Sequence, residues 1–208
     1  DAANDGIFVY NRGTNYTSGI TLEAGQRLYG DGTPVTANGL ALGASASNST
    51  INFGATNGIV LASGNTISGI SLNGTAAGGT GIIDSGATVG TLNISGVSIS
   101  GTGRALAIQN GGALNASFDT LSSSGSSTQG VLITGNATGT VSATTGAIAT
   151  STGSGFQIGT SGSANSGGSV AVTYGGTITN ATGAAVEVQN HTANAITFSG
   201  NIADSAGL

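Results

Sequence analysis

The sequence predicts an all-β protein, a right-handed parallel β-helix (β-solenoid) with about three short strands per coil and roughly eight coils. Glycines that each open a short apolar run recur 22 to 28 residues apart, and such a period is typical of one structural unit stacked on copies of itself. The apolar runs alternate with Ser and Thr and are bounded by Gly or Asn, which is typical of strands. No stretch combines helical spacing with good helix formers.

The glycine series gives the predicted coils their order along the chain. Within one period, the run after Gly81 is followed by apolar runs at residues 89–94 and 96–99, so each coil carries three strands with turns between them. Parallel crossovers strongly prefer the right hand, which is the basis for the predicted handedness. The seven glycines of the series are Gly58, Gly81, Gly103, Gly130, Gly155, Gly183 and Gly207.

The first fifty residues are less regular than the rest. Residues 6–10, 19–22 and 26–30 are predicted strands of an opening coil, and residues 35–42 with 50–53 supply the next coil. Further along, the two longest glycine steps place extra residues in two polar stretches. We expect these stretches, residues 122–127 and 159–168, to form loops that bulge from the coils.

The domain organisation follows from the uninterrupted repeat. No composition shift divides the chain, so residues 1–208 are predicted to form a single β-solenoid domain. Gly207 opens a further apolar run, and we therefore expect this domain to be a fragment of a longer solenoid. Terminal coils present unpaired strand edges, which favours end-to-end pairing with another copy or continuation of the same solenoid.

Composition excludes several classes of partner. Charged residues make up 5% of the chain, and its three basic residues are Arg12, Arg27 and Arg104. Nucleic-acid binding needs many Lys or Arg contacts to phosphate, so it is excluded. No apolar run is long enough for a membrane-spanning helix, so no membrane insertion is expected. Hydrophobic residues reach 38%, which favours a folded chain over a disordered one.

Several stretches resemble right-handed parallel β-helix proteins. The chain near its start looks like their entry segment, its middle is similar to their repeating coil, and its last third resembles the β-strand-repeat modules of very large bacterial surface proteins. This resemblance implies an extracellular or bacterial cell-surface setting, as in autotransporter-like adhesins and structural fibres. The stretches that carry the resemblance are residues 5–10, 16–22, 25–32, 58–61, 65–72, 174–180, 186–188 and 196–200.

The sequence is compatible with two functions. The first is a non-enzymatic, extracellular structural or adhesive β-solenoid that acts as a rigid stalk or as a fibre subunit by end-to-end stacking. The alternative is a carbohydrate-binding or polysaccharide-degrading β-helix protein, with surface glycans as its partner, because the same fold class hosts pectin-cleaving enzymes. The alternative needs charged and aromatic side chains that converge on one outward face, and it depends on the positions of Asp84, Arg104, Asp119 and Glu187.

No catalytic, cofactor-binding or metal site is predicted, and the chain is expected not to be an enzyme. Glycoside hydrolysis needs a close pair of carboxylates, and no two acids occupy evidently equivalent places in adjacent coils. A lyase needs a base, yet the chain has no Lys, and Arg104 has no evident Asp partner. The single histidine, His191, lies in a turn, and zinc sites need clusters of His and Cys.

Two weaker candidates remain near the start of the chain. Asp31 before Gly32 offers one carboxylate to a calcium loop, although an ordinary turn explains the pair better. Exposed tyrosines can stack on sugars, but packing within the first coil is the preferred interpretation of this group. Its members are Tyr10, Tyr16 and Tyr29.

Overall fold

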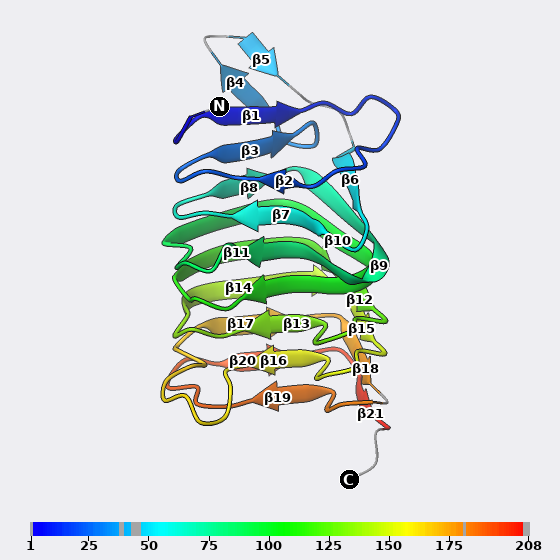
Figure 1. The fold of residues 1–208 in the computed structure, drawn as a ribbon, viewed down its shortest axis with the longest axis vertical. Coiled ribbons are helices and arrows are strands. Elements are labelled where there is room, and N and C mark those ends of the chain that lie inside the picture. Colours follow the sequence, from blue (N-terminus) through cyan, green and yellow to red (C-terminus); the bar gives the residue numbers. More distant parts are fainter. Residues whose placement is uncertain (1, 38–39, 43–46, 181, 206–208) are drawn as a thin grey trace.

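The computed structural model of the chain describes residues 2–37, 40–42, 47–180 and 182–205. These residues form a parallel β-solenoid of about eight turns and contain no helix (Figure 1). The predicted all-β class and the stack of parallel coils are therefore confirmed. No helix that is long and apolar enough to cross a membrane occurs in this described part of the chain.

Strands from successive coils pair in register and build three walls around the core. The first wall contains β2 (Ile20–Thr21), β7 (Asn57–Leu61), β13 (Val131–Ile133), β16 (Phe156–Ile158) and β19 (Val186–Val188). The second wall contains β1 (Gly6–Val9), β3 (Arg27–Gly30), β8 (Thr66–Ser68), β11 (Ala113–Leu121), β14 (Thr138–Thr145), β17 (Ala171–Tyr174) and β20 (Ile196–Phe198). The third wall contains β6 (Ser49–Phe53), β12 (Ser123–Ser124), β15 (Ala147–Ala149), β18 (Thr177–Asn180) and β21 (Ile202–Asp204).

Three long strands depart from the predicted three short strands per coil, and one of them, β11, runs through the second and third walls. β9 (Ile70–Asp84) runs through the third and first walls, and β10 (Thr91–Ile108) runs through all three. β10 continues through both corners, with shifts in its pairing register between Ile94 and Val97 and between Thr102 and Arg104. Glycines at the corners adopt backbone angles that other residues rarely take. Gly96 has a φ of 58° and Gly101 a φ of 92°. These strands bend at the corners without ending.

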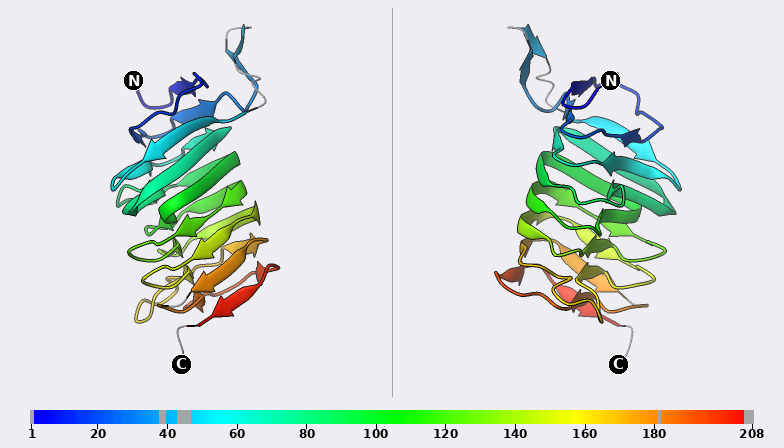
Figure 2. Two further views of the ribbon diagram at one scale, coloured as in Figure 1. Left: turned by 90° about the vertical axis from the view of Figure 1, so that its right-hand side faces the viewer. Right: turned by 60° about the vertical axis from the view of Figure 1, so that its left-hand side comes forward.

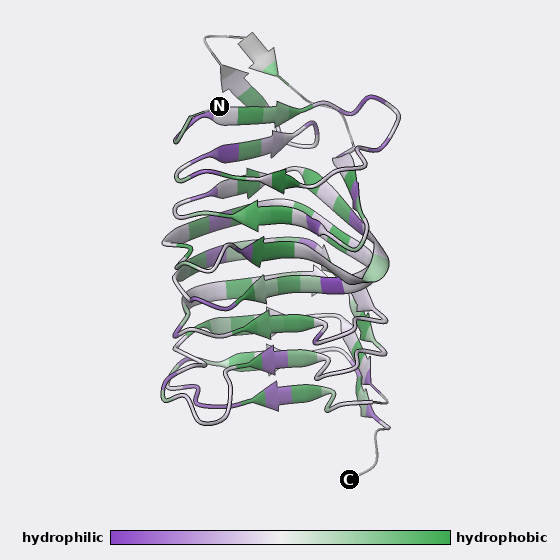
Figure 3. Ribbon diagram, in the orientation of Figure 1, coloured by the Kyte–Doolittle hydropathy of each residue, from purple (hydrophilic) through white to green (hydrophobic). Residues whose placement is uncertain are grey.

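The core consists of columns of inward apolar side chains. In the first wall one column pairs residue by residue along the rod, and its middle members are almost fully buried. Outward positions alternate with inward ones along each strand, and Ser and Thr fill many of the outward positions of the second wall. Figure 3 shows the resulting alternation of apolar and polar bands along several strands. The middle members of this column are Ile59, Ile82, Leu106, Val131 and Phe156.

The glycine series has a packing cause. A β-carbon on Gly81 would lie 2.8 Å from Cγ2 of Ile99, and one on Gly130 would lie 2.6 Å from Cγ2 of Ile148. Both isoleucines belong to the third wall, so glycine at this corner leaves room for the side chains that cross the core. Because core side chains are close-packed, a larger residue would displace them.

The glycine series was partly wrong. The register aligns Gly58, Gly81, Gly130 and Gly155 with Ala105 and Ala185. Gly103 and Gly183 precede these alanines by two residues and lie outside the ladder. In these two coils the corner accommodates the buried β-carbon of an alanine, so the spacing of glycines alone misplaced two coils. Gly207 lies outside the described residues.

The opening coil is present, but the next coil differs from the prediction. The described residues of this stretch do not join the walls: β4 (Val35–Ala37) and β5 (Leu40–Leu42) form an antiparallel pair, called the hairpin below. The hairpin rises beyond β1 at the N-terminal end of the rod (Figures 1 and 2). An alternating apolar strand has the same pattern whether it pairs with a coil or with its own neighbour, which is why the sequence did not separate the two.

The two expected loops had different outcomes. Residues 159–168 form an irregular loop, as predicted. The segment 122–127 is instead partly wall: Ser123 and Ser124 form β12, and the Ser123 hydroxyl donates a buried hydrogen bond of 2.6 Å to the Gly103 carbonyl. A serine that bonds to the neighbouring coil's backbone can occupy an inward position, so polarity alone did not predict a loop here.

Candidate functional site

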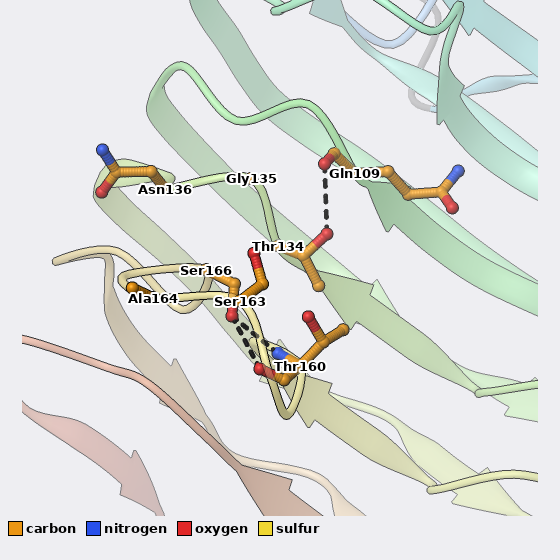
Figure 4. Close-up of a pocket in the computed structure, with 8 residues that line it drawn as sticks. All are labelled: Gln109, Thr134, Gly135, Asn136, Thr160, Ser163, Ala164 and Ser166. Carbon is orange, nitrogen blue, oxygen red and sulfur yellow. Dashed lines mark hydrogen bonds between the residues drawn. The ribbon is translucent and has the colours of Figure 1, made fainter.

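The larger of two described pockets lies where three consecutive coils turn out of the first wall. It has a volume of about 330 Å³. The turns after β10, β13 and β16 contribute to it, and the 159–168 loop forms one side (Figure 4). The residues that line it are Gln109, Thr134, Gly135, Asn136, Thr160, Ser163, Ala164 and Ser166.

Local backbone geometry shapes this pocket. Gly135 and Gly159 both have a φ of 75°, and Asn165 turns the loop with a φ of 57°. A β-carbon on Gly159 would collide with the Gln189 carbonyl of the next coil. The Ser166 hydroxyl closes the loop, because it accepts from the Thr160 N–H at 2.9 Å and donates to the Thr160 carbonyl at 3.0 Å. The 159–168 loop therefore forms a well-ordered side of the pocket.

The chemistry of the pocket is neutral. Its lining contains hydroxyl and amide side chains and no charged residue. The Thr134 hydroxyl donates to the Gln109 carbonyl at 3.2 Å, while the Gln109 side chain extends away from the 159–168 loop (Figure 4). Such a lining can exchange hydrogen bonds with a polar, uncharged ligand, but it offers no carboxylate or imidazole for proton transfer.

Asp84 lies beside this pocket and is 4% exposed. It aligns with Leu61 in the first wall, an inward position that is apolar in the neighbouring coils. One carboxylate oxygen accepts from the N–H groups of Gln109 and Asn110, both at 2.7 Å, and from the Asn110 side chain at 3.1 Å. Its other oxygen is buried and has no partner among the described residues. Asp84 therefore anchors the turn that begins at Gln109.

Arg104 lies on the outward face of the first wall. Its guanidinium donates to the Thr128 hydroxyl and, at 3.1 Å, to the Gln129 side chain of the next coil. Burial lowers the pKa of Arg104 from its ordinary value, because desolvation disfavours the charged form. Arginine remains protonated in proteins, so this group offers a cation and not a base.

Glu187 lies on the same wall but three coils further toward the C-terminus. Its two oxygens accept from the Ser154 hydroxyl and from the Gln189 side chain, each at 2.5 Å. Asp119 is exposed on β11, outside the first wall. Asp84, Arg104 and Glu187 thus share the first wall but lie on different coils, Asp84 is buried, and Asp119 lies outside that wall. The four residues on which the glycan alternative depends therefore do not converge on one outward face.

The remaining candidates near chain turns contact backbone groups. His191 pairs with Gly168 of the preceding coil, and its Nε2 lies 3.0 Å from the Val170 carbonyl. The Asp31 carboxylate accepts from the Asn11 N–H at 3.4 Å. No group of three His, Cys, Asp or Glu residues within metal-binding reach occurs in the described ranges. Both residues therefore have local structural contacts.

The three tyrosines near the start separate into packed and exposed rings. Tyr16 is half-buried, donates to the Tyr10 carbonyl at 2.9 Å and carries the Arg12 guanidinium 4.7 Å above its ring. Tyr29 lines a second pocket, of about 220 Å³, at the base of the hairpin. Tyr10 is the exposed member, with its ring packed edge-on against Phe8 at a centroid distance of 4.6 Å. Of these three rings, Tyr10 alone is exposed, and the other two are half-buried.

Sequence reasoning missed the pocket and the burial of Asp84. A signal for Asp84 exists, because the run Gly81–Asp84 ends in Asp where the run Gly58–Leu61 ends in Leu.

Comparisons of the chain with protein-family models, curated proteins and solved structures find no match. Inferences about function therefore rest on the residues and their geometry.

Proposed function

We propose that this protein is a non-enzymatic structural or adhesive rod, acting as a rigid stalk or as a fibre subunit by end-to-end stacking. One observation carries the proposal: the core columns run along the rod, while Asp84 is buried and the charged candidates outside the core, Arg104, Asp119 and Glu187, lie on separate coils or walls. Coil-to-coil backbone hydrogen bonds resist bending, and a surface of small uncharged residues provides few groups for chemistry.

We place this rod outside the cell or on a bacterial cell surface. The proposal draws on the resemblance of residues 174–180, 186–188 and 196–200 to modules of bacterial surface proteins. The absence of cysteine is compatible with it, since a chain exported unfolded would form no stray disulfide. Immunogold labelling of whole cells that produce the protein tests the location, and label confined to the cytoplasm would overturn it.

The non-enzymatic part is tested by a degradation screen. The purified protein is incubated with neutral and acidic polysaccharides, and new reducing ends and unsaturated products are measured. We expect no product above a heat-treated control, because Asp84 is buried, and Asp119 and Glu187 lie on different coils and walls. Cleavage that disappears when Asp84 or Glu187 is replaced by the corresponding amide would contradict the proposal.

A second candidate function is the binding of a neutral glycan in the 330 Å³ pocket. The observation that favours it is the uncharged lining of hydroxyl and amide side chains. The volume of the pocket also lies near the lower end of the range for small-ligand sites. Titration calorimetry with neutral oligosaccharides tests it. Binding that is weakened by Thr134→Val and unchanged by Ser117→Ala, an exposed serine on β11, would support this function. Equal binding by both variants would contradict it.

A further inference from the structure

We propose that Asn110 is a latent deamidation site and that the buried carboxylate of Asp84 keeps it in the amide form. The site lies in the turn between β10 and β11, in the middle of the rod (Figure 1). Its chemistry is that of an Asn–Gly step, in which the following glycine has no side chain to hinder ring closure. The site depends on neither the stalk nor the fibre role of the rod.

Asn110 differs in its setting from comparable asparagines. Three Asn–Gly steps lie in the part of the chain that the structure describes, and Asn110 is the one outside a strand. Asn57 begins β7, and Asn73 lies within β9, where its side chain donates to the Asn52 amide oxygen at 3.2 Å. Ladder hydrogen bonds hold strand backbone extended and resist the rotation that ring closure needs. The turn has to restrain Asn110 in another way.

Glycine at position 111 is required by the stacking of the coils. Gly111 has a φ of 63°, and a β-carbon there would collide with the Gly135 carbonyl of the next coil. A larger residue, which would slow ring closure, therefore does not fit. The Gly111 N–H donates no hydrogen bond to a described residue, so the nitrogen that attacks in ring closure is not held by a partner.

Deamidation of this step forms and breaks defined bonds. The Gly111 nitrogen attacks the side-chain carbonyl carbon of Asn110, and the bond from that carbon to the amide nitrogen breaks. Ammonia leaves and carries away the proton that the Gly111 nitrogen loses. Water then opens the cyclic imide at either carbonyl. The products are aspartate and isoaspartate at position 110, and each adds a negative charge to the turn.

Asp84 opposes ring closure through the amide nitrogen. One carboxylate oxygen accepts from the Asn110 side chain at 3.1 Å and from the backbone N–H of the same residue at 2.7 Å. The amide is thus held beside the N–H of its own residue, whereas ring closure needs its carbon to reach the Gly111 nitrogen. An acceptor on the amide nitrogen also strengthens amide resonance, which makes the carbonyl carbon less electrophilic. Asp84 is therefore a positioning residue for Asn110.

The surroundings of Asp84 strengthen this restraint. Its side chain is 4% exposed and occupies an inward position, where it aligns with Leu61. Hydrogen bonds to an ionised acceptor are stronger than those between neutral groups, and a low local dielectric strengthens them further. Breaking the contact to Asn110 would leave the carboxylate with fewer donors, because its other oxygen has no partner among the described residues.

Deamidation would turn the same contact into a repulsion. In aspartate at position 110, an oxygen replaces the amide nitrogen that lies 3.1 Å from the Asp84 oxygen. Two carboxylates that share a site disfavour each other's charge. Asp84 also accepts from the Gln109 N–H, and the Gln109 carbonyl accepts from the Thr134 hydroxyl in the larger pocket. A change at Asn110 would therefore loosen the turn and reach one side of that pocket.

Site-resolved mass spectrometry tests the restraint. The unmodified protein and Asp84→Leu are incubated at mildly alkaline pH, and aspartate and isoaspartate are quantified at Asn110 and Asn73. Leucine suits this position because Leu61 occupies it one coil earlier, and circular dichroism verifies the fold. The ratio of Asn110 conversion to Asn73 conversion should rise at least about ten-fold in Asp84→Leu, the factor for losing one hydrogen bond to a charged group.

Ile108→Val is the matched control for this measurement. Ile108 is buried and immediately precedes the turn, and its replacement leaves Asp84 in place. The conversion ratio should therefore stay at the value of the unmodified protein. An unchanged ratio in Asp84→Leu, or an equal rise in Ile108→Val, would overturn the proposal.

Aspartate placed directly at position 110 tests the facing pair, and it decides the proposal if Asp84→Leu does not fold. Asn110→Asp should lower the midpoint of urea unfolding, and the loss should be smaller in an Asp84→Asn background, where a single charge remains. Asn136→Asp, an exposed change in the turn of the next coil, is the control and should cost little in either background. Equal losses from Asn110→Asp in the two backgrounds would show that the carboxylates do not face each other and would overturn the site.

Discussion

The hydroxyl of Tyr174 donates a hydrogen bond of 3.0 Å to the carbonyl of Leu121, two coils toward the N-terminus. The bond crosses the intervening coil at Gly146, where a side chain would collide with both partners. Backbone pairing joins each coil only to its neighbours, so this bond is a tie across three coils. The Tyr174 ring also packs against Phe156 and Phe198, at centroid distances of 5.7 and 6.3 Å.

Tyr174 should make the fold sensitive to alkali. Its side chain is 1% exposed, and burial raises the pKa of the phenol above its ordinary value of 10.0. The folded state therefore keeps a proton that the unfolded chain loses. The contribution to stability is fully present below pH 10 and declines as the pH rises above it, by about 1.4 kcal/mol per pH unit.

Urea unfolding at several pH values between 8 and about 12 tests this titration. Tyr174→Phe should lower stability at pH 8 by about 0.5–1.5 kcal/mol, the usual worth of a hydrogen bond, and should flatten the alkaline decline. The matched control is Tyr10→Phe, because that ring is 52% exposed. An alkaline decline of the same slope in Tyr174→Phe and the unmodified protein would contradict the assignment.

Gly146→Ala should be strongly destabilising. A β-carbon at this position would lie 2.1 Å from the Leu121 carbonyl oxygen and 2.8 Å from the Tyr174 hydroxyl oxygen. Both the backbone ladder and the tyrosine tie would have to shift, and overpacking of this kind costs about 1–3 kcal/mol.

Gly78→Ala is the control for this substitution, since a β-carbon there meets nothing within 4 Å. Its effect on the unfolding midpoint should be small. Equal losses of stability in Gly146→Ala and Gly78→Ala would contradict the prediction. They would show that the conformational freedom of glycine matters more than the close contacts around Gly146.

Two buried serines should respond differently to removal of the hydroxyl. Ser123 donates to the Gly103 carbonyl at 2.6 Å, whereas the Ser151 hydroxyl is buried with no partner in the described part of the chain. Ser123→Ala should therefore cost about 1–3 kcal/mol, and Ser151→Ala should be neutral or stabilising. Chemical denaturation of both variants measures the difference, and a larger loss in Ser151→Ala would contradict the hydrogen-bond assignment.

Thr150→Gly should stabilise the protein. Thr150 has a φ of 54°, a left-handed conformation that costs a β-branched residue roughly 1–2 kcal/mol. Its hydroxyl accepts from the Gly125 N–H at 3.0 Å, but that N–H also bonds to the Ala149 carbonyl, so its loss leaves no orphan donor. We expect a gain of about 1 kcal/mol in unfolding free energy. Thr152→Gly, in the same turn, is the comparison. A gain in unfolding free energy in Thr152→Gly without one in Thr150→Gly would contradict the proposal that the backbone of Thr150 is strained.

The sequence predicted the coils well because their cause is local. Gly58, Gly81, Gly130 and Gly155 each precede an apolar run, and the same feature that marks them in the sequence leaves space in the core. Ala105 and Ala185 occupy the same corner, and no spacing rule distinguishes them from other alanines. Their alignment follows from which strands pair, which is a property of the stacked coils.

The hairpin and the pocket depend on contacts that are distant in the sequence. Val35 belongs to a strand whose pattern suits a wall, and only the choice of pairing partner separates a hairpin from a coil. Gln109, Thr134 and Thr160 lie about 25 residues apart and come together because their coils stack in register. Single-sequence patterns contain no direct record of such stacking.

Asn65 illustrates a polar core position with a partial sequence signal. Its amide is fully buried, accepts from the Ala62 N–H at 2.7 Å and donates to the Glu23 and Gln26 carbonyls of the preceding coil. Gln26 repeats the arrangement one coil earlier, where it accepts from the Glu23 N–H and donates to the Ala2 carbonyl. The two sites share a glycine followed by an amide residue. That pattern is also typical of an exposed turn, so it did not predict burial.

The hairpin shows how the rod tolerates added sequence. Arg27 pairs with Thr66 and Ile20 with Ile59, so the walls keep their register although the hairpin lies between the paired strands. The entropy cost of closing a loop grows only slowly with its length. The corner after β3 is therefore a natural graft point: a foreign peptide exchanged for residues 35–42 should be displayed at the end of the rod while its circular dichroism spectrum stays that of the parent.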